Sequence, residues 1–69
     1  MDNVIKISTE MINGSAYEIY MELPGENADV PYYSAVIGGM VSTGFDNTEE
    51  LFRAIHNNEA EFKAMPRNN

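Results

Sequence analysis

The chain contains no cysteine. Without thiols it has neither a disulfide nor thiolate zinc ligands, and its composition suits a reducing compartment, for which we expect the cytoplasm. Its longest uncharged run, Val30 to Phe45, contains a proline and several glycines and is shorter than the roughly 20 apolar residues of a membrane span. The first residues, Met1 to Asn3, lack the basic and apolar regions of a signal peptide, so we expect no export.

Basic residues are also scarce, because four Lys and Arg stand against eleven Asp and Glu and give a formal net charge of −7. No base occurs between Lys6 and Arg53. The acids in that interval are Glu10, Glu18, Glu22, Glu26, Asp29, Asp46, Glu49 and Glu50. Such a surface repels phosphate, which disfavours direct binding of nucleic acid or anionic lipid, and it attracts basic surfaces. The alternative interpretation is that the charge serves only solubility.

A length of 69 residues suffices for one domain, which we place at residues 1–65, with a polar tail at 66–69. A single core of this size rarely contributes more than about 3–5 kcal/mol of net stability. Dimerisation would add buried surface, so the sequence leaves both a monomer and a homodimer open.

The first half of the chain predicts a β-hairpin. Residues 4–12 and 15–23 are rich in β-branched and alternating apolar residues, with Asn13-Gly14 between them. A two-residue turn would place the two apolar stripes on opposite faces of the sheet. A three-residue loop would instead set Ile7 opposite Met21 and Lys6 opposite Glu22, so burial favours that register.

A second strand pair is expected after the loop at 24–29. Residues 32–37 and 40–45 read as short strands joined at Gly38-Gly39, although 34–41 also fits one buried helical stretch. Asp46 or Asn47 can then cap a helix, with Glu50 near its positive end.

The helical stripe comprises Leu51, Ile55, Phe62 and Met65, but Asn57-Asn58 interrupts it. The sequence therefore predicts an α+β fold, in which a small antiparallel sheet packs against one C-terminal helix or two short ones.

No residue pattern indicates catalysis, a metal or a cofactor, and we expect none of these. His56 is the only histidine, and no nucleophile, second ligand or carboxylate pair stands near it at a useful spacing. Gly38-Gly39 lacks the glycine-rich and lysine context of a phosphate loop, so it predicts a turn.

The expected activity is therefore binding of a protein. On the preferred register Tyr20 lies on the face away from Ile19 and Met21, an unusual place for an aromatic unless it meets a partner or packs under another element. The predicted contact residues are Glu18, Tyr20, Glu22, the loop acids Glu26 and Asp29, and the helix-start acids Asp46, Glu49 and Glu50.

Residues 45–51, Phe-Asp-Asn-Thr-Glu-Glu-Leu, resemble the strand-to-helix passage of small phage anti-CRISPR proteins that inhibit type I effector complexes. The order of an N-terminal hairpin containing residues 5–9, a further strand pair and a capped helix is also similar. This resemblance covers about half the chain. It implies a stoichiometric inhibitor that binds an effector subunit in an infected bacterial cell and blocks target DNA, partly by imitating the charge of DNA.

A second resemblance joins residues 39–44, Gly-Met-Val-Ser-Thr-Gly, with residues 48–51, Thr-Glu-Glu-Leu. Together they are similar to the last strand and helix of HicB-like antitoxin domains, although the chain lacks their usual Pro-Asp-Leu-Pro-Gly segment. This resemblance implies neutralisation of a basic RNA-binding toxin. Both resemblances imply a partner of the same charge.

Overall fold

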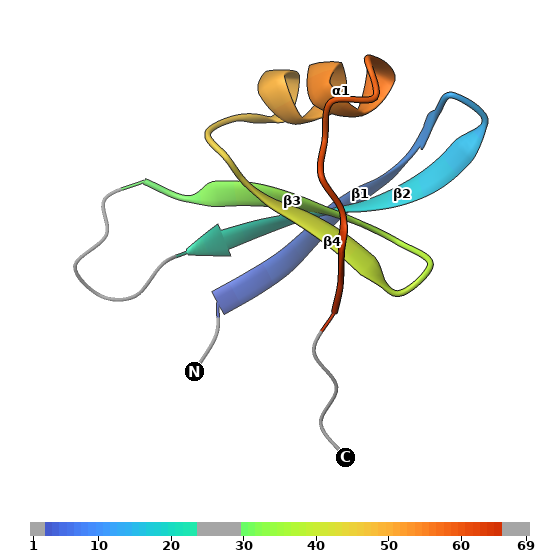
Figure 1. Cartoon of the computed structure of the whole chain (residues 1–69). Helices are drawn as coiled ribbons and strands as arrows, with labels where there is room; N and C mark the ends of the chain where they lie inside the picture. The colour runs from blue at the N-terminus through green and yellow to red at the C-terminus, as the bar shows by residue number, and fades with distance from the viewer. Residues whose placement is uncertain (1–2, 24–29, 66–69) are drawn as a thin grey trace.

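The computed structural model describes residues 3–23 and 30–65, and these form a five-stranded antiparallel sheet with one helix across one face (Figure 1). The elements are β1 (Asn3–Ile12), β2 (Ser15–Leu23), β3 (Tyr32–Ile37), β4 (Met40–Phe45), α1 (Thr48–His56) and β5 (Lys63–Ala64). The strands lie in chain order across the sheet. The predicted α+β class is confirmed. The loop acids Glu26 and Asp29 and the tail 66–69 lie outside the described residues.

The first hairpin closes through a two-residue turn, so the predicted three-residue loop is wrong. Asn13 and Gly14 both have positive φ, 52° and 83°, as a tight hairpin turn of this length requires, and Ile12 pairs with Ser15. A β-bulge between Lys6 and Ser8 then shifts the register. The extra residue, Ile7, puts Ile5 opposite Met21, so the apolar residues at the start of β1 share a face with those of β2, although the predicted partner of Met21 was Ile7.

The bulge also changes the predicted partner of Lys6. This lysine lies opposite Tyr20 and not opposite Glu22, and its Nζ lies 3.6 Å from Glu18 Oε2. Between the bulge and the turn, Ser8 and Glu10 stand opposite Ile19 and Tyr17. Polar side chains of β1 therefore share a face with apolar side chains of β2, which is the mismatch that sequence reasoning rejected.

The second hairpin forms as predicted, with Gly38 and Gly39 at its turn, and the alternative helix over 34–41 is wrong. Their φ angles, 55° and 79°, are ones that residues with a Cβ rarely adopt. A second bulge lies where Tyr33 pairs with Phe45 and Ser34 with Thr43. It places the ring of Phe45 on the face that α1 covers.

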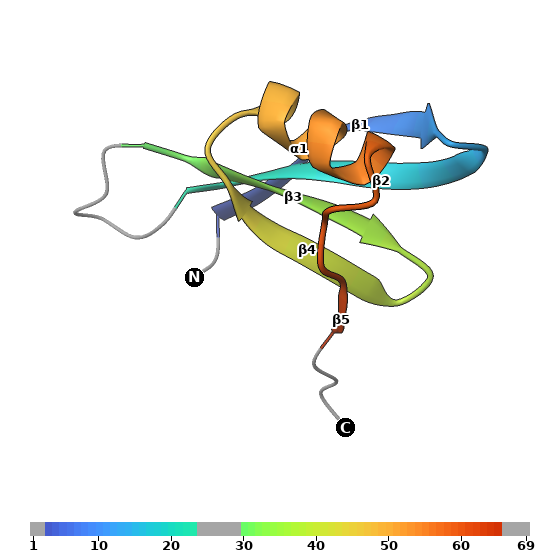
Figure 2. The same cartoon turned by 45° about the horizontal axis from the view of Figure 1, so that its top comes forward.

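Helix α1 begins at the predicted boundary but ends earlier than predicted. Asn47 is the N-cap, and its Oδ1 accepts a hydrogen bond from the Glu50 amide at 2.8 Å. The helix ends at His56, and Asn58 adopts a positive φ of 59°. The predicted continuation or second short helix is wrong, because the chain runs from α1 past β4 to β5 (Figure 2).

The Asn47 cap predicts a specific loss of stability. Asn47→Ala is expected to lower the free energy of unfolding by about 1 kcal/mol, because the Glu50 amide loses its acceptor at the helix start. Urea unfolding followed by circular dichroism measures this change. The neighbouring substitution Asp46→Ala is the control and should cost clearly less; equal losses would assign the effect to something other than the cap.

The core lies between α1 and one face of the sheet, here called the helix face. Its fully buried apolar residues are Ile19, Ala35, Leu51 and Ile55, and partly buried aromatic and apolar side chains surround them. The opposite face, here called the open face, carries the alternate residues of each strand. No element in the described part of the chain covers it. Two surfaces with different chemistry follow from this one-sided core.

Candidate partner-binding surface

The most acidic part of the described structure is the helix layer, defined as residues 46–62, which comprises α1 and the segment that follows it. Five acids against one arginine give the layer a formal charge of −4. The acids are Asp46, Glu49, Glu50, Glu59 and Glu61, and all five are exposed. Three of them belong to the predicted contact set; Glu59 and Glu61 do not.

Packing of the helix layer fixes which of its side chains point outward. In α1 the buried residues are Leu51 and Ile55, so Glu49 and Glu50 lie on the solvent side of the first turn. The following segment is extended, and its Ala60 and Phe62 pack against the core. The alternate residues, Glu59 and Glu61, therefore project into solvent beside α1.

The phenyl ring of Phe62 anchors this segment. Its centroid lies 5.9 Å from that of the Tyr17 ring, with an angle of 39° between the ring planes, a separation typical of favourable aromatic pairs. The Ala54 carbonyl accepts hydrogen bonds from the amides of Glu59 and Ala60 at 2.7 and 3.2 Å. The two exposed acids are thus carried on a segment fixed at both its backbone and its core side.

The carboxylates of the helix layer lack basic partners. Within the residues that the structure describes, no ion pair joins any of the five to a lysine or arginine. Glu49 and Glu50 lie in the first turn of α1, where the positive end of the helix dipole favours negative charge. Their charge is otherwise available to a basic surface.

A shallow cleft of about 260 Å³ lies beside this layer at β4. Its lining includes Thr43 and Phe45 from β4 together with Glu59, Glu61 and Lys63 from the segment after α1. The cleft exists because β5 pairs only with Met40 and Val41, so the rest of β4 has no strand beyond it in the described structure. A partner side chain can therefore reach the β4 edge between the acids.

The remaining predicted contact residues lie on the open face, where Glu18, Tyr20 and Glu22 alternate along β2. The Tyr20 hydroxyl donates a hydrogen bond to Glu18 Oε1 at 3.0 Å, and this bond raises the pKa of Tyr20 above its ordinary value of 10.0. Glu18 also pairs with Lys6. Its carboxylate thus already has two partners within the chain.

Glu22 is held by hydroxyl groups. The Tyr32 hydroxyl donates to Glu22 Oε1 at 3.0 Å, and the Ser34 hydroxyl donates to Glu22 Oε2 at 2.7 Å. Thr43 Oγ1 lies 2.6 Å from Ser34 Oγ. Either hydroxyl can be the donor in this short contact, and the Thr43 hydroxyl also lies within 3.5 Å of Glu22 Oε2 as a donor. Ser34 is 2% exposed, so the network explains how a buried polar residue is satisfied in the open face.

The network borders a groove of about 270 Å³, whose lining also includes Val36, Val41 and Met65. Register places Lys63 beside Val41 on the same face. Lys63 also lines the cleft beside Glu59 and Glu61, so it lies at the border between the open face and the helix layer. On the open face Lys6 pairs with Glu18, and hydroxyl groups hold Glu22, so both carboxylates have partners within the chain.

The structure thus divides the predicted contact set between two faces of the sheet. Glu18, Tyr20 and Glu22 lie together on the open face, and Asp46, Glu49 and Glu50 lie together in the helix layer. Sequence reasoning missed Glu59 and Glu61 because it assigned them to a helix. The available signal was the alternation of Glu59 and Glu61 with Ala60 and Phe62, which is a strand-like period.

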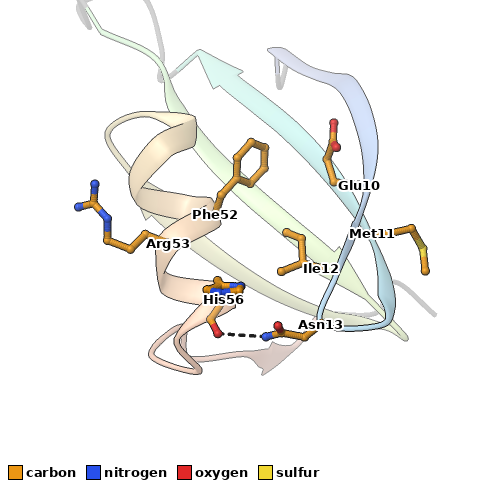
Figure 3. Close-up of a pocket in the computed structure, with 7 residues that line it drawn as sticks. All are labelled: Glu10, Met11, Ile12, Asn13, Phe52, Arg53 and His56. Atoms are coloured by element: carbon orange, nitrogen blue, oxygen red, sulfur yellow. Dashed lines mark hydrogen bonds between the residues drawn. The ribbon is translucent and has the colours of Figure 1, made fainter.

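An open cavity of about 540 Å³ lies between the tip of the first hairpin and α1 (Figure 3). Asn13 Nδ2 donates to the carbonyls of Ile55 and His56 at 3.3 and 3.1 Å and so ties the turn to the helix end. Figure 3 shows Arg53 directed away from Glu10 across this cavity. Among the described residues, no group of three or more His, Cys, Asp or Glu side chains could hold a metal ion, and His56 has no second ligand beside it.

Comparisons with known proteins find no match. No family model fits the chain, and no curated protein or solved structure matches it. In residues 3–23 and 30–65 no helix combines the length and apolar character that crossing a membrane demands.

Proposed function

We propose that this protein is a stoichiometric inhibitor that binds a basic, nucleic-acid-binding protein through its helix layer. The observation that carries the proposal is the set of five exposed carboxylates without basic partners, on a layer of formal charge −4. On the open face, by contrast, Glu18 and Glu22 have partners within the chain. A surface that presents carboxylates at fixed positions competes with phosphate for lysines and arginines of a nucleic-acid groove.

The placement of the acids supports this mode of binding. Glu49 and Glu50 are presented by a rigid helix, and Glu59 and Glu61 by a segment anchored through Phe62. The backbone that carries these carboxylates is already ordered, so binding requires the ordering of their side chains alone. Charge of one sign also steers the encounter, which gives fast association at low salt.

Among inhibitors of this kind, the anti-CRISPR class is the first candidate, because residues 45–51 resemble its strand-to-helix passage. In this reading the helix layer occupies the DNA-binding groove of a type I effector complex. A HicB-like antitoxin is the alternative, in which the same layer covers the RNA-binding surface of a small ribonuclease toxin. The two readings share the surface and differ in the partner.

A capture experiment distinguishes them. The immobilised protein is offered a purified type I effector complex and, separately, a purified small ribonuclease toxin of the kind that HicB-like antitoxins neutralise, at about 50 mM and 500 mM salt. We expect retention of the effector complex at low salt and its release at high salt. Retention of the toxin instead would select the alternative reading. Failure to retain either protein at low salt would refute the proposed function.

A further inference from the structure

The outer edge of β1 is a long strand edge of mixed apolar and neutral polar character. In the described structure β1 pairs only with β2, so half of its backbone N–H and C=O groups face outward. Its exposed apolar side chains are Val4, Ile5, Ile7 and Met11, with exposed fractions between 44% and 70%. Neither a helix nor a described loop covers this edge. Natural sheets usually protect such an edge, and pairing with another strand is one means of doing so.

We infer that the β1 edge is where a second copy of this chain binds, in antiparallel pairing that extends the two sheets into one. The strand carries Lys6 and Glu10 and is therefore neutral, whereas the whole chain has a net charge of −7. Two identical acidic molecules repel each other least where each presents a neutral, apolar strip. The core contains only four fully buried apolar residues among those described, so added burial has a large relative effect on it.

Charge and burial argue against two other ways of joining two copies. Helix layers placed against each other would bring two segments of charge −4 together. Open faces placed against each other would bury the ion pair and the hydroxyl network around Glu18 and Glu22. Edge pairing covers neither surface. The dimer would therefore present two helix layers and bind two partner molecules.

The hairpin geometry fixes which amides are available for this pairing. With a two-residue turn, Ile12 and Ser15 form a hydrogen-bonded pair, so Thr9 and Met11 direct their N–H and C=O groups away from β2. Symmetric pairing centred on Thr9 sets this residue opposite the second copy's Thr9, a favourable cross-strand pair. Centring on Glu10 would instead oppose two carboxylates. The Thr9 register is the one that we assign.

Sedimentation equilibrium tests the interface. The wild-type protein is expected to have about twice the 7.7 kDa chain mass. Thr9→Pro, which removes an outward N–H that β2 does not use, is expected to sediment as a monomer with an unchanged circular dichroism spectrum. Thr9→Val keeps the amide and should remain dimeric. A monomeric wild-type protein at about 0.5 mM, or a folded Thr9→Pro dimer, would overturn the inference.

Cross-linking tests the register and does not depend on the proline variant. The chain has no cysteine, so a single Thr9→Cys or Met11→Cys substitution forms a disulfide only between copies. At the assigned register the two Thr9 Cα atoms are about 5.5 Å apart, and the two Met11 Cα atoms about 14 Å apart. We expect Thr9→Cys to form dimers at least tenfold faster under mild oxidation. Equal or faster cross-linking through the more exposed Met11→Cys would overturn the register.

Discussion

Leu51→Ala is expected to unfold a large fraction of the protein at room temperature. Leu51 is completely buried between α1 and the sheet, where it packs in one cluster with Ile19, Ala35 and Ile55. Truncating a buried leucine costs about 2–5 kcal/mol, because apolar contacts are lost and a cavity remains. The net stability of a domain of this size rarely exceeds about 3–5 kcal/mol. Far-ultraviolet circular dichroism across a urea titration measures the loss.

The matched control is Leu51→Met, which nearly conserves side-chain volume and is expected to cost less than about 1.5 kcal/mol. Both variants are compared with wild type at one protein concentration, because association would add to the apparent stability. A Leu51→Ala variant that unfolds at the wild-type urea midpoint would show that the cluster around Leu51 is not the main source of stability.

The second large effect concerns association with the basic partner. The triple variant Asp46→Asn, Glu59→Gln, Glu61→Gln removes three unpaired carboxylates from the helix layer while leaving Glu49 and Glu50 at the helix start. We expect its association rate with the captured effector complex to fall by about tenfold at low salt. The dissociation rate should change less, because exposed charges act mainly on the encounter. Stopped-flow or surface-based kinetics at several salt concentrations provide both rates.

An equal change of charge elsewhere provides the control. Glu10→Gln, Glu18→Gln, Glu22→Gln also alters the formal charge by three, but on the sheet, where Glu18 and Glu22 already have partners within the chain. If net charge alone governed association, both triple variants would slow it equally. If the open-face members of the predicted contact set were the contact site, the control variant would show the larger effect.

Local signals in the sequence predicted most of the elements. Asn13-Gly14 and Gly38-Gly39 mark the two hairpin turns, and Asn47 with Glu50 marks the helix start, because each position requires a particular backbone conformation or side-chain acceptor. These preferences act over three or four residues. They do not depend on the rest of the fold. The second turn and the helix start lie where the sequence placed them, whereas the first turn has two residues and not the predicted three.

The predictions from the sequence were wrong where contacts between residues far apart in the chain select one of several locally possible conformations. A two-residue turn forms at Asn13-Gly14, and next to it polar residues of β1 stand opposite apolar residues of β2. The bulge at Ile7 corrects this mismatch at the start of β1, and a prediction that assumes one constant register contains no such bulge. Phe62 satisfies the helical spacing from Leu51 and Ile55, yet it reaches the core from an extended segment. The register of the first hairpin and the end of α1 decide which acids share a surface. The predicted contact residues are therefore divided between two faces of the sheet.

Competition with target DNA tests the central claim, that the helix layer occupies a nucleic-acid-binding groove. A type I effector complex is saturated with fluorescent target DNA at concentrations well above the dissociation constant, and the protein is titrated in while fluorescence anisotropy is followed. The account predicts that the DNA is released completely, with a stoichiometric end point, and that the Asp46→Asn, Glu59→Gln, Glu61→Gln variant needs a higher concentration. A ternary complex in which protein and DNA remain bound together would contradict it.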